Sequence, residues 1–268
     1  MLATLVLMTA LGAHTLAVQI EGSIDATMEK TAPEHGAALS SQVARLLRWR
    51  GKPNSQVHRG DKVAVLFDDT GLLLALEYQG LELKEQAYLY RDHLGRERYY
   101  AEDGRLLEPV MQKAPVPNYW QITETVQNHR GDRRHRGVDL KAPIGATVVS
   151  PRDGTITRLN WHRGANGLCV ELTYADGLRA RFLHMSKVEP LHVGQSLKMG
   201  AELGKVGTTG HSTAPHLHYE LVDGNDKPQD PLKYHGTKAL RLSDLELTEF
   251  QKARAAADLE FKRLSHGA

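Results

Sequence analysis

Two short motifs contain residue types that bind and use a metal ion. His135 and Asp139 lie four positions apart in the chain, and His216 and His218 lie two positions apart. His135, Asp139 and His218 together offer two imidazoles and one carboxylate, a ligand set that suits zinc and leaves one coordination position open for water. An open position is typical of a catalytic metal site. These residues therefore predict metal-dependent chemistry.

The spacing within each motif predicts how its side chains are positioned. Side chains alternate between the two faces of an extended strand, so His216 and His218 would share one face. His135 and Asp139 are an even number of residues apart, so an extended segment would also place both on one side. The glycine and the β-branched valine between them disfavour a helix. We therefore expect a site built on strands.

The sequence around these motifs resembles the lysostaphin/LytM-type zinc metallopeptidases, which cut peptide bonds in bacterial peptidoglycan. The resemblance rests on residues 135–156, 181–221 and 230–234. Part of the chain before these segments also resembles the corresponding region of Gram-negative murein endopeptidases of the same family. The resemblance implies an antiparallel β-sheet or barrel-like catalytic domain and a zinc cofactor.

The resemblance also implies a role for each site residue. Zinc would be bound by His135, Asp139 and His218. His184 and His216 match two further histidines of the family, which flank the metal water and the substrate carbonyl. One of these two would exchange protons with the water and the leaving amine, and the other would stabilise the oxyanion. The sequence leaves open which of the two performs which task.

The expected function is zinc-dependent hydrolysis of peptide cross-links in peptidoglycan, with the bond between D-Ala and diaminopimelate as the expected target. One alternative is a non-catalytic module that binds peptidoglycan or activates cell-wall amidases. Such modules usually lack some of the ligands, whereas this chain retains all of them. A zinc hydrolase acting on a protein is the third hypothesis.

Composition agrees with a folded enzyme. The chain has 268 residues, of which 41% are hydrophobic, and this is enough to bury a core in two domains. A net charge of +2 is too small to indicate a nucleic-acid partner. The one cysteine, Cys169, lies between leucine and valine, so we expect a buried thiol and no disulfide within the chain.

Residues 1–17 are apolar and resemble the hydrophobic region of a secretory signal peptide. They are short for a membrane-spanning helix, and the usual basic residues at the start are missing. A short membrane anchor, with peripheral membrane association through the N-terminus, and a buried first helix are the alternatives. Export would place the protein in the periplasm or outside the cell, where peptidoglycan lies.

Residues 18–113 are expected to form a smaller α+β module. The pattern predicts a strand start within residues 18–24, a helix from Asp25 to Trp49, strands at 63–67, 72–78 and 85–90, and a turn at 99–105. In the endopeptidases that this region resembles, such a module can cover the catalytic groove. Intramolecular inhibition by residues 18–113 is therefore one hypothesis, and a packing domain without a regulatory role is the alternative.

Residues 114–120 contain two prolines and are expected to be a linker, followed by the catalytic domain at 121–236. Short strands separated by Asp-Gly and Asn-Gly turns predict an antiparallel sheet there, with turns at Asp153, Asn166, Asp176 and Asp223. Residues 237–268 are expected to be a helical tail, with a helix over 243–264. The whole chain is thus expected to be mainly β with some α.

Residues 122–134 differ from the family that the rest of the domain resembles. Residues 122–134 occupy the place where relatives usually have a serine-rich strand, a turn containing glycine and arginine, and a longer loop. Because this segment is expected to border the groove, the difference affects the shape of the cleft and the choice of substrate.

Overall fold

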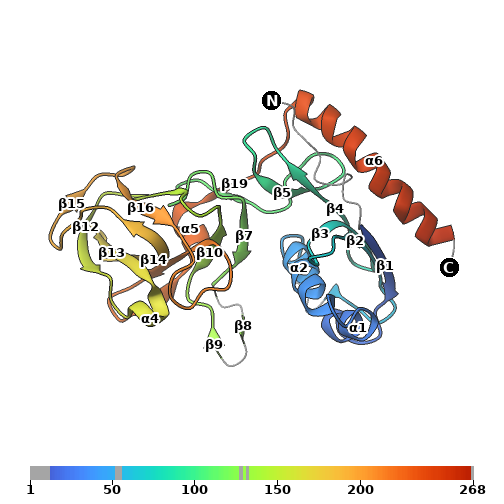
Figure 1. Ribbon diagram of the computed structural model, residues 1–268, viewed down its shortest axis with the longest axis horizontal. Coiled ribbons are helices and arrows are strands. Elements are labelled where there is room, and N and C mark those ends of the chain that lie inside the picture. The colour runs from blue at the N-terminus through green and yellow to red at the C-terminus, as the bar shows by residue number, and fades with distance from the viewer. Residues whose placement is uncertain (1–12, 52–55, 127–128, 131–132, 267–268) are drawn as a thin grey trace. The chain divides into compact units, whose positions relative to one another are not determined.

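The chain folds into two compact units (Figure 1). The computed structural model describes residues 13–51, 56–126, 129–130 and 133–266. Met1–Pro109 and Ala239–Ala268 make up the first unit, and Val110–Lys238 make up the second. The chain therefore passes between the units twice, and the C-terminal segment returns to the unit formed by the N-terminal part.

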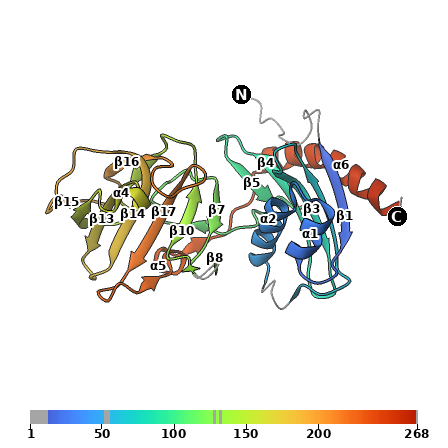
Figure 2. The ribbon, with the colours of Figure 1, turned by 60° about the horizontal axis from the view of Figure 1, so that its bottom comes forward.

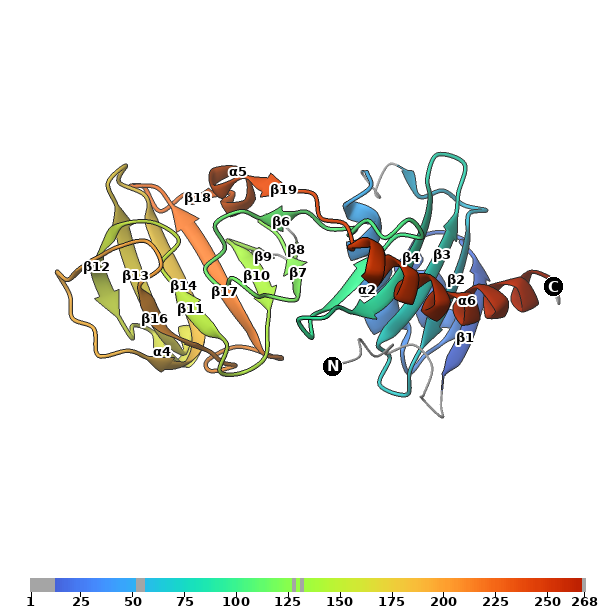
Figure 3. The ribbon, with the colours of Figure 1, turned by 90° about the horizontal axis from the view of Figure 1, so that it is seen from above.

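The first unit is built on an antiparallel sheet with strand order β1-β2-β3-β4-β5 (Figure 2). Its strands are β1 His14–Gln19, β2 Lys62–Phe67, β3 Leu73–Gln79, β4 Lys84–Arg91 and β5 Glu97–Tyr100. Helices α1 (Ile24–Thr31) and α2 (Gly36–Arg48) lie on one face, and α6 (Asp244–His266) crosses the other (Figure 3). Phe250 of α6 packs edge-on against Tyr88 and Tyr90, so the sheet is covered on both faces.

The structure corrects three local predictions in this unit. The predicted single helix from Asp25 to Trp49 is two helices, because Pro33 cannot continue α1. Ser23 does not belong to a strand start, since its hydroxyl accepts a hydrogen bond from the backbone of Ala26 and caps α1. The predicted turn at 99–105 begins later, because the buried aromatic pair Tyr99 and Tyr100 ends strand β5.

The second unit contains a ten-stranded antiparallel sheet. Its longest path runs β15-β12-β13-β14-β17-β10-β7, while β16 pairs with both β11 and β14, and β18 pairs with β17. The strands of this unit are β6 Val110–Met111, β7 Gln121–Glu124, β8 His129–Arg130, β9 Arg133–Arg134, β10 Val138–Lys141, β11 Thr147–Val149, β12 Gly154–Leu159, β13 Leu168–Tyr174, β14 Arg179–Val188, β15 Ser196–Leu197, β16 Glu202–Val206, β17 His216–Val222, β18 Pro228–Gln229 and β19 Thr237–Lys238. Its helices are α4 Arg163–Asn166 and α5 Pro231–His235.

The predicted fold class is confirmed: the chain is mainly antiparallel β with a few helices, and it ends in a helix. The predicted tight turn at Asn166 is wrong, because the short helix α4 lies in the connection between β12 and β13. Residues 110–120, which include the predicted linker, lie in the second unit, where the carbonyl of Pro115 accepts a hydrogen bond from the amide of Val149.

In the part of the chain that the structure describes, no helix combines the length and the apolar character that a bilayer crossing requires. The predicted signal peptide or anchor at residues 1–17 falls mostly outside the described residues, which begin at residue 13. His14–Gln19 form strand β1.

We expect His235 of α5 to make the stability of the protein depend on pH. Burial, together with the positive charges of Arg152 and Lys113, lowers the pKa of His235 from 6.5 to about 4. Its Nε2 lies 2.8 Å from the hydroxyl of Tyr219. Because the unfolded chain binds a proton more readily between pH 6.5 and pH 4, folding stability is lost as the pH falls through this window. At pH 5 this one group should cost about 2 kcal/mol relative to pH 7.

The measurement is the free energy of unfolding in urea at pH 7 and pH 5, for the natural chain and for His235→Gln, both with excess chelator so that metal binding does not contribute. We expect the loss between the two pH values to be about 2 kcal/mol smaller in the variant. Equal losses in the two proteins would contradict the assignment.

Candidate metal centre

The pairing of two strands brings the two sequence motifs together. Asp139 of β10 lies directly opposite His218 of β17. His216 lies on the same strand two residues earlier, and its Nε2 is 3.7 Å from Oδ1 of Asp139, while Nδ1 of His218 is 2.7 Å from the same oxygen. Both histidines of the second motif therefore face the carboxylate of the first.

His135 reaches the same place from outside the strand. It precedes β10, so the expectation of one extended segment from His135 to Asp139 is wrong for its first half. Gly137 lies in the bend between them, where a Cβ atom would come within 2.3 Å of the carbonyl oxygen of Tyr219. A glycine at this position lets the backbone of the first motif approach β17 closely.

Three ligand atoms converge at this point. Nε2 of His135 lies 3.1 Å from Oδ1 of Asp139 and 3.0 Å from Nδ1 of His218. Nδ1 of His218 lies 2.7 Å from Oδ1 of Asp139. Ligand atoms bound about 2.0–2.1 Å from a tetrahedral zinc ion lie about 3.3–3.4 Å apart, so the three atoms need to move apart by only a few tenths of an ångström to about 0.7 Å to admit the ion. All three side chains are at least nine-tenths buried.

The hydrogen bonds behind the two imidazoles show that these three atoms suit a cation. His135 donates from Nδ1 to the carbonyl oxygen of Thr125, so its Nε2 carries a lone pair. His218 donates from Nε2 to the carboxylate of Glu220, so its Nδ1 also carries a lone pair. When both imidazoles are neutral, two nitrogen lone pairs and the carboxylate of Asp139 point at one another, so the three atoms are arranged to bind a cation. The donor set fits a divalent metal such as zinc.

The electrostatics of the cluster agree with this interpretation. Burial lowers the pKa of His218, but hydrogen bonds to Asp139 and Glu220 outweigh it and raise the pKa to about 9. Burial raises the pKa of Asp139, but hydrogen bonds to His135 and His218 hold it well below its usual range. The cluster thus binds one positive charge strongly, and a metal ion would take the place of the proton.

His184 and His216 flank these three residues. Their ring centroids lie 5.0 Å apart, and that of His184 lies 5.9 Å from His218. His184 donates from Nδ1 to the carbonyl of Thr209, and His216 donates from Nδ1 to the carbonyl of Ala214. In both rings Nε2 remains for a reacting group. The structure therefore brings all five predicted site residues together, while the separate roles assigned to them stay predictions.

His184 has an unusual backbone. Its φ of 65° lies in the left-handed region, which residues other than glycine seldom adopt, and it lies where the pairing of β14 with β13 is irregular. Such local strain is common at functional positions. Burial lowers the pKa of His184 to about 4, so that its ring is neutral at pH 7.

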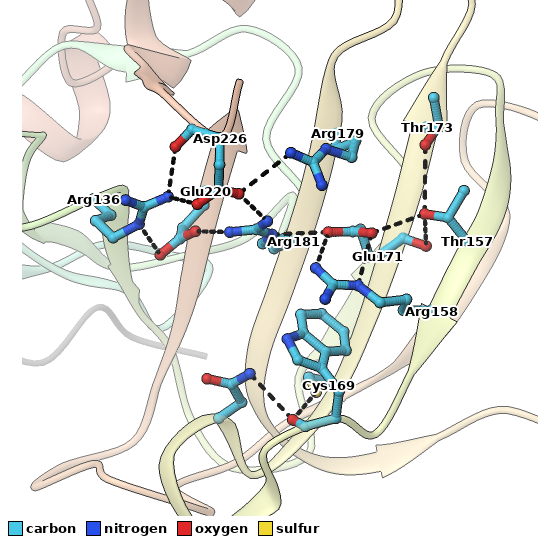
Figure 4. A network of polar contacts seen from close by, with 12 residues as sticks. Arg136, Thr157, Arg158, Cys169, Glu171, Thr173, Arg179, Arg181, Glu220 and Asp226 are labelled. Atoms are coloured by element: carbon cyan, nitrogen blue, oxygen red, sulfur yellow. Dashed lines mark hydrogen bonds and ion pairs between the residues drawn. The ribbon is translucent and has the colours of Figure 1, made fainter. Parts of the chain in front are cut away.

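Glu220, which was not among the predicted site residues, contacts the predicted ligand His218. Glu220 accepts the hydrogen bond of His218 and is itself contacted by Arg136 and Arg181 (Figure 4). The spacing in the sequence could have indicated this contact, because residue 220 lies two positions beyond His218 and therefore on the same face of the strand.

Cys169 is buried as expected, and its thiol lies near the carbonyl of Trp161.

Comparisons with known proteins match the part of the chain that contains these residues. The family model for peptidase family M23 matches residues 133–231. Peptidoglycan DD-endopeptidase ShyA of Vibrio cholerae is 28% identical over 254 residues, which cover 88% of this chain and 57% of that protein. Peptidoglycan DD-endopeptidase ShyB of the same organism is 33% identical over 160 residues, which cover 57% of this chain and 37% of that protein.

Among solved structures, a zinc containing peptidase from Vibrio cholerae is 23% identical, with a TM-score of 0.42, over 82% of this chain and 70% of that one. The chain spans little more than half of ShyA and about a third of ShyB.

Proposed function

We propose that the protein is a zinc-dependent endopeptidase that hydrolyses peptide cross-links of bacterial peptidoglycan, and that residues 133–231, which match the model of peptidase family M23, carry this activity. The observation that carries the proposal is the convergence of one ligand atom each from His135, Asp139 and His218 on a single buried point. The names of the relatives, which are peptidoglycan DD-endopeptidases, support the choice of substrate.

A zinc ion held by His135, Asp139 and His218 would supply Lewis acidity toward the scissile carbonyl and would lower the pKa of a water molecule to about 7. The protein's own contribution is orientation. The carbonyl of Thr125 and the carboxylate of Glu220 fix the two imidazoles in the tautomers that leave a lone pair toward the ion.

One of the two rings of His184 and His216 is proposed to transfer protons, and the other to stabilise the oxyanion. Each ring is anchored through Nδ1, so each can present Nε2 to a substrate without rotating. One ring would accept a proton from the attacking water and return it to the nitrogen of the leaving amine, which must leave protonated. The other would donate a hydrogen bond to the oxygen of the former carbonyl as negative charge develops there.

This function implies a place and a form of control. Because the substrate lies outside the cytoplasm, we propose that the protein acts in the periplasm or is secreted.

We also propose that residues 18–113 restrain access to the catalytic groove. Limited proteolysis that removes residues 18–113 should then raise the rate of cross-link cleavage, and an unchanged rate would contradict the restraint.

The proposed activity is tested on purified peptidoglycan sacculi. We expect the zinc-loaded protein to convert cross-linked peptide dimers into monomers without cutting the glycan strands. Removing the metal with a chelator should abolish the reaction, and added zinc should restore it. The products are identified by mass after digestion of the glycan. A protein that binds sacculi without releasing monomers would support the non-catalytic alternative. Cleavage of protein substrates alone would support the third hypothesis.

A further inference from the structure

Glu220 differs from the groups that anchor the other histidines of the metal centre. The rings of His135, His184 and His216 each donate from Nδ1 to a backbone carbonyl. His218 is turned the other way, because its Nε2 lies 3.1 Å from Oε1 of Glu220 while its Nδ1 faces the other ligand atoms. Of these four rings, only His218 has a charged acceptor behind it.

A row of alternating charges crosses the sheet and ends at Glu220 (Figure 4). In the strand register Glu220 lies opposite Arg181, Arg181 lies opposite Glu171, and Glu171 lies opposite Arg158. Nη1 of Arg181 is 3.1 Å from Oε2 of Glu220, and its Nε is 2.8 Å from Oε2 of Glu171. Arg158 contacts Glu171 at 3.0 and 2.6 Å. The strands β12, β13, β14 and β17 each contribute one charge to this row.

A second carboxylate connects the row to the segment that carries His135. Asp226 follows β17, contacts Arg181, and lies 2.7 Å from Nη2 of Arg136. Nε of Arg136 is also 3.6 Å from Oε1 of Glu220. Because Arg136 directly follows His135 in the chain, the same group of charges contacts both ligand-bearing segments.

We propose that Glu220 is a positioning residue of the metal centre: it fixes His218 as the tautomer protonated at Nε2, and the arginines hold its carboxylate in place. This inference rests on the proposed function, since it assumes that His218 binds zinc through Nδ1. The side chain of Glu220 is only 8% exposed, so bulk water has little access to its position. A carboxylate behind a ligating imidazole orients the ring and increases its basicity, and losing such a partner typically weakens metal binding about 10- to 100-fold.

The test compares two substitutions in the full-length protein. Glu220→Gln removes the carboxylate that accepts the hydrogen bond of His218. Glu171→Gln removes the other carboxylate that contacts Arg181 and leaves the histidines of the site untouched. Zinc affinity is measured by competition with a chromophoric chelator, and stability by unfolding in urea. We expect both variants to lose stability, but only Glu220→Gln to bind zinc about 10- to 100-fold more weakly. A purely structural role would lower stability without separating the two variants in zinc affinity.

Two further measurements test the inference, and the first uses only the natural chain, so it does not depend on how well the variants fold. Nitrogen-15 NMR of histidine side chains in the zinc-loaded natural chain should show His218 protonated at Nε2 and His135 protonated at Nδ1. The visible absorption of bound Co²⁺ should change in Glu220→Gln and stay unchanged in Glu171→Gln.

The outcomes separate the two proposals. Suppose that the natural chain takes up zinc. If His218 is then protonated at Nδ1, or if Glu220→Gln binds zinc as tightly as the natural chain, the role of Glu220 is overturned and the proposed function stands. A natural chain that takes up neither Zn²⁺ nor Co²⁺ overturns both.

Discussion

Replacing His218 by alanine removes stoichiometric zinc from the protein and lowers kcat/KM for cross-link cleavage by about a thousandfold or more. The imidazole supplies one of three ligands, and the two that remain, His135 and Asp139, leave the ion with too few protein donors for a stable catalytic site. Lewis-acid stabilisation is worth several kcal/mol in the transition state, which corresponds to the expected loss of rate. Elemental analysis and release of peptide monomers from sacculi are measured on the same preparation.

His192→Ala is the matched control, because His192 is exposed and lies outside the centre. It should keep both zinc and activity. If His218→Ala retains one equivalent of zinc, the ligand assignment is wrong, even if the activity is lost.

Replacing His184 by alanine has the opposite combination of effects: zinc is retained and turnover is lost. The ring of His184 is anchored by Thr209 beside the cluster, but it is not one of the three residues whose ligand atoms converge. Loss of a group that transfers a proton or stabilises an oxyanion typically lowers kcat by about 10²- to 10⁴-fold. The measurements are zinc content and kcat on a soluble cross-linked peptide.

His216→Ala is the informative comparison for this prediction. Because its ring lies beside His184 and its Nε2 faces Asp139, we expect it also to keep zinc and to lose turnover. A His184→Ala protein with normal kcat would remove this residue from the mechanism. Loss of zinc from His184→Ala would instead indicate that His184 is itself a zinc ligand.

The sequence was sufficient to identify the chemistry because the signals for it are local. The alternation of side chains along a strand places His216 and His218 on one face, and in the structure both rings approach the same carboxylate oxygen of Asp139. The turn expected at Asp176 connects β13 and β14, where the amide of Gly177 donates to the carbonyl of Tyr174. Such features depend on neighbours within a few residues, which is the range over which sequence patterns are informative.

The sequence did not determine where the long connections lead. His135 and His218 are 83 residues apart, and only the antiparallel register of β10 and β17 brings their rings together. The helix at the end of the chain was expected, but its return to the first unit, with Phe250 against Tyr88, follows from burial of apolar surface that no local pattern specifies.

The anchoring of the metal centre was also decided by tertiary structure. The position of Glu220 was visible in the sequence, but its partner Arg181 lies on another strand, and their contact exists only because β14 and β17 pair in one register. The left-handed backbone of His184 likewise lies where the pairing of β14 with β13 is irregular. Residue types and spacing thus specified which atoms can bind and react, while strand pairing decided their orientation and charge environment, because those depend on contacts between segments far apart in the chain.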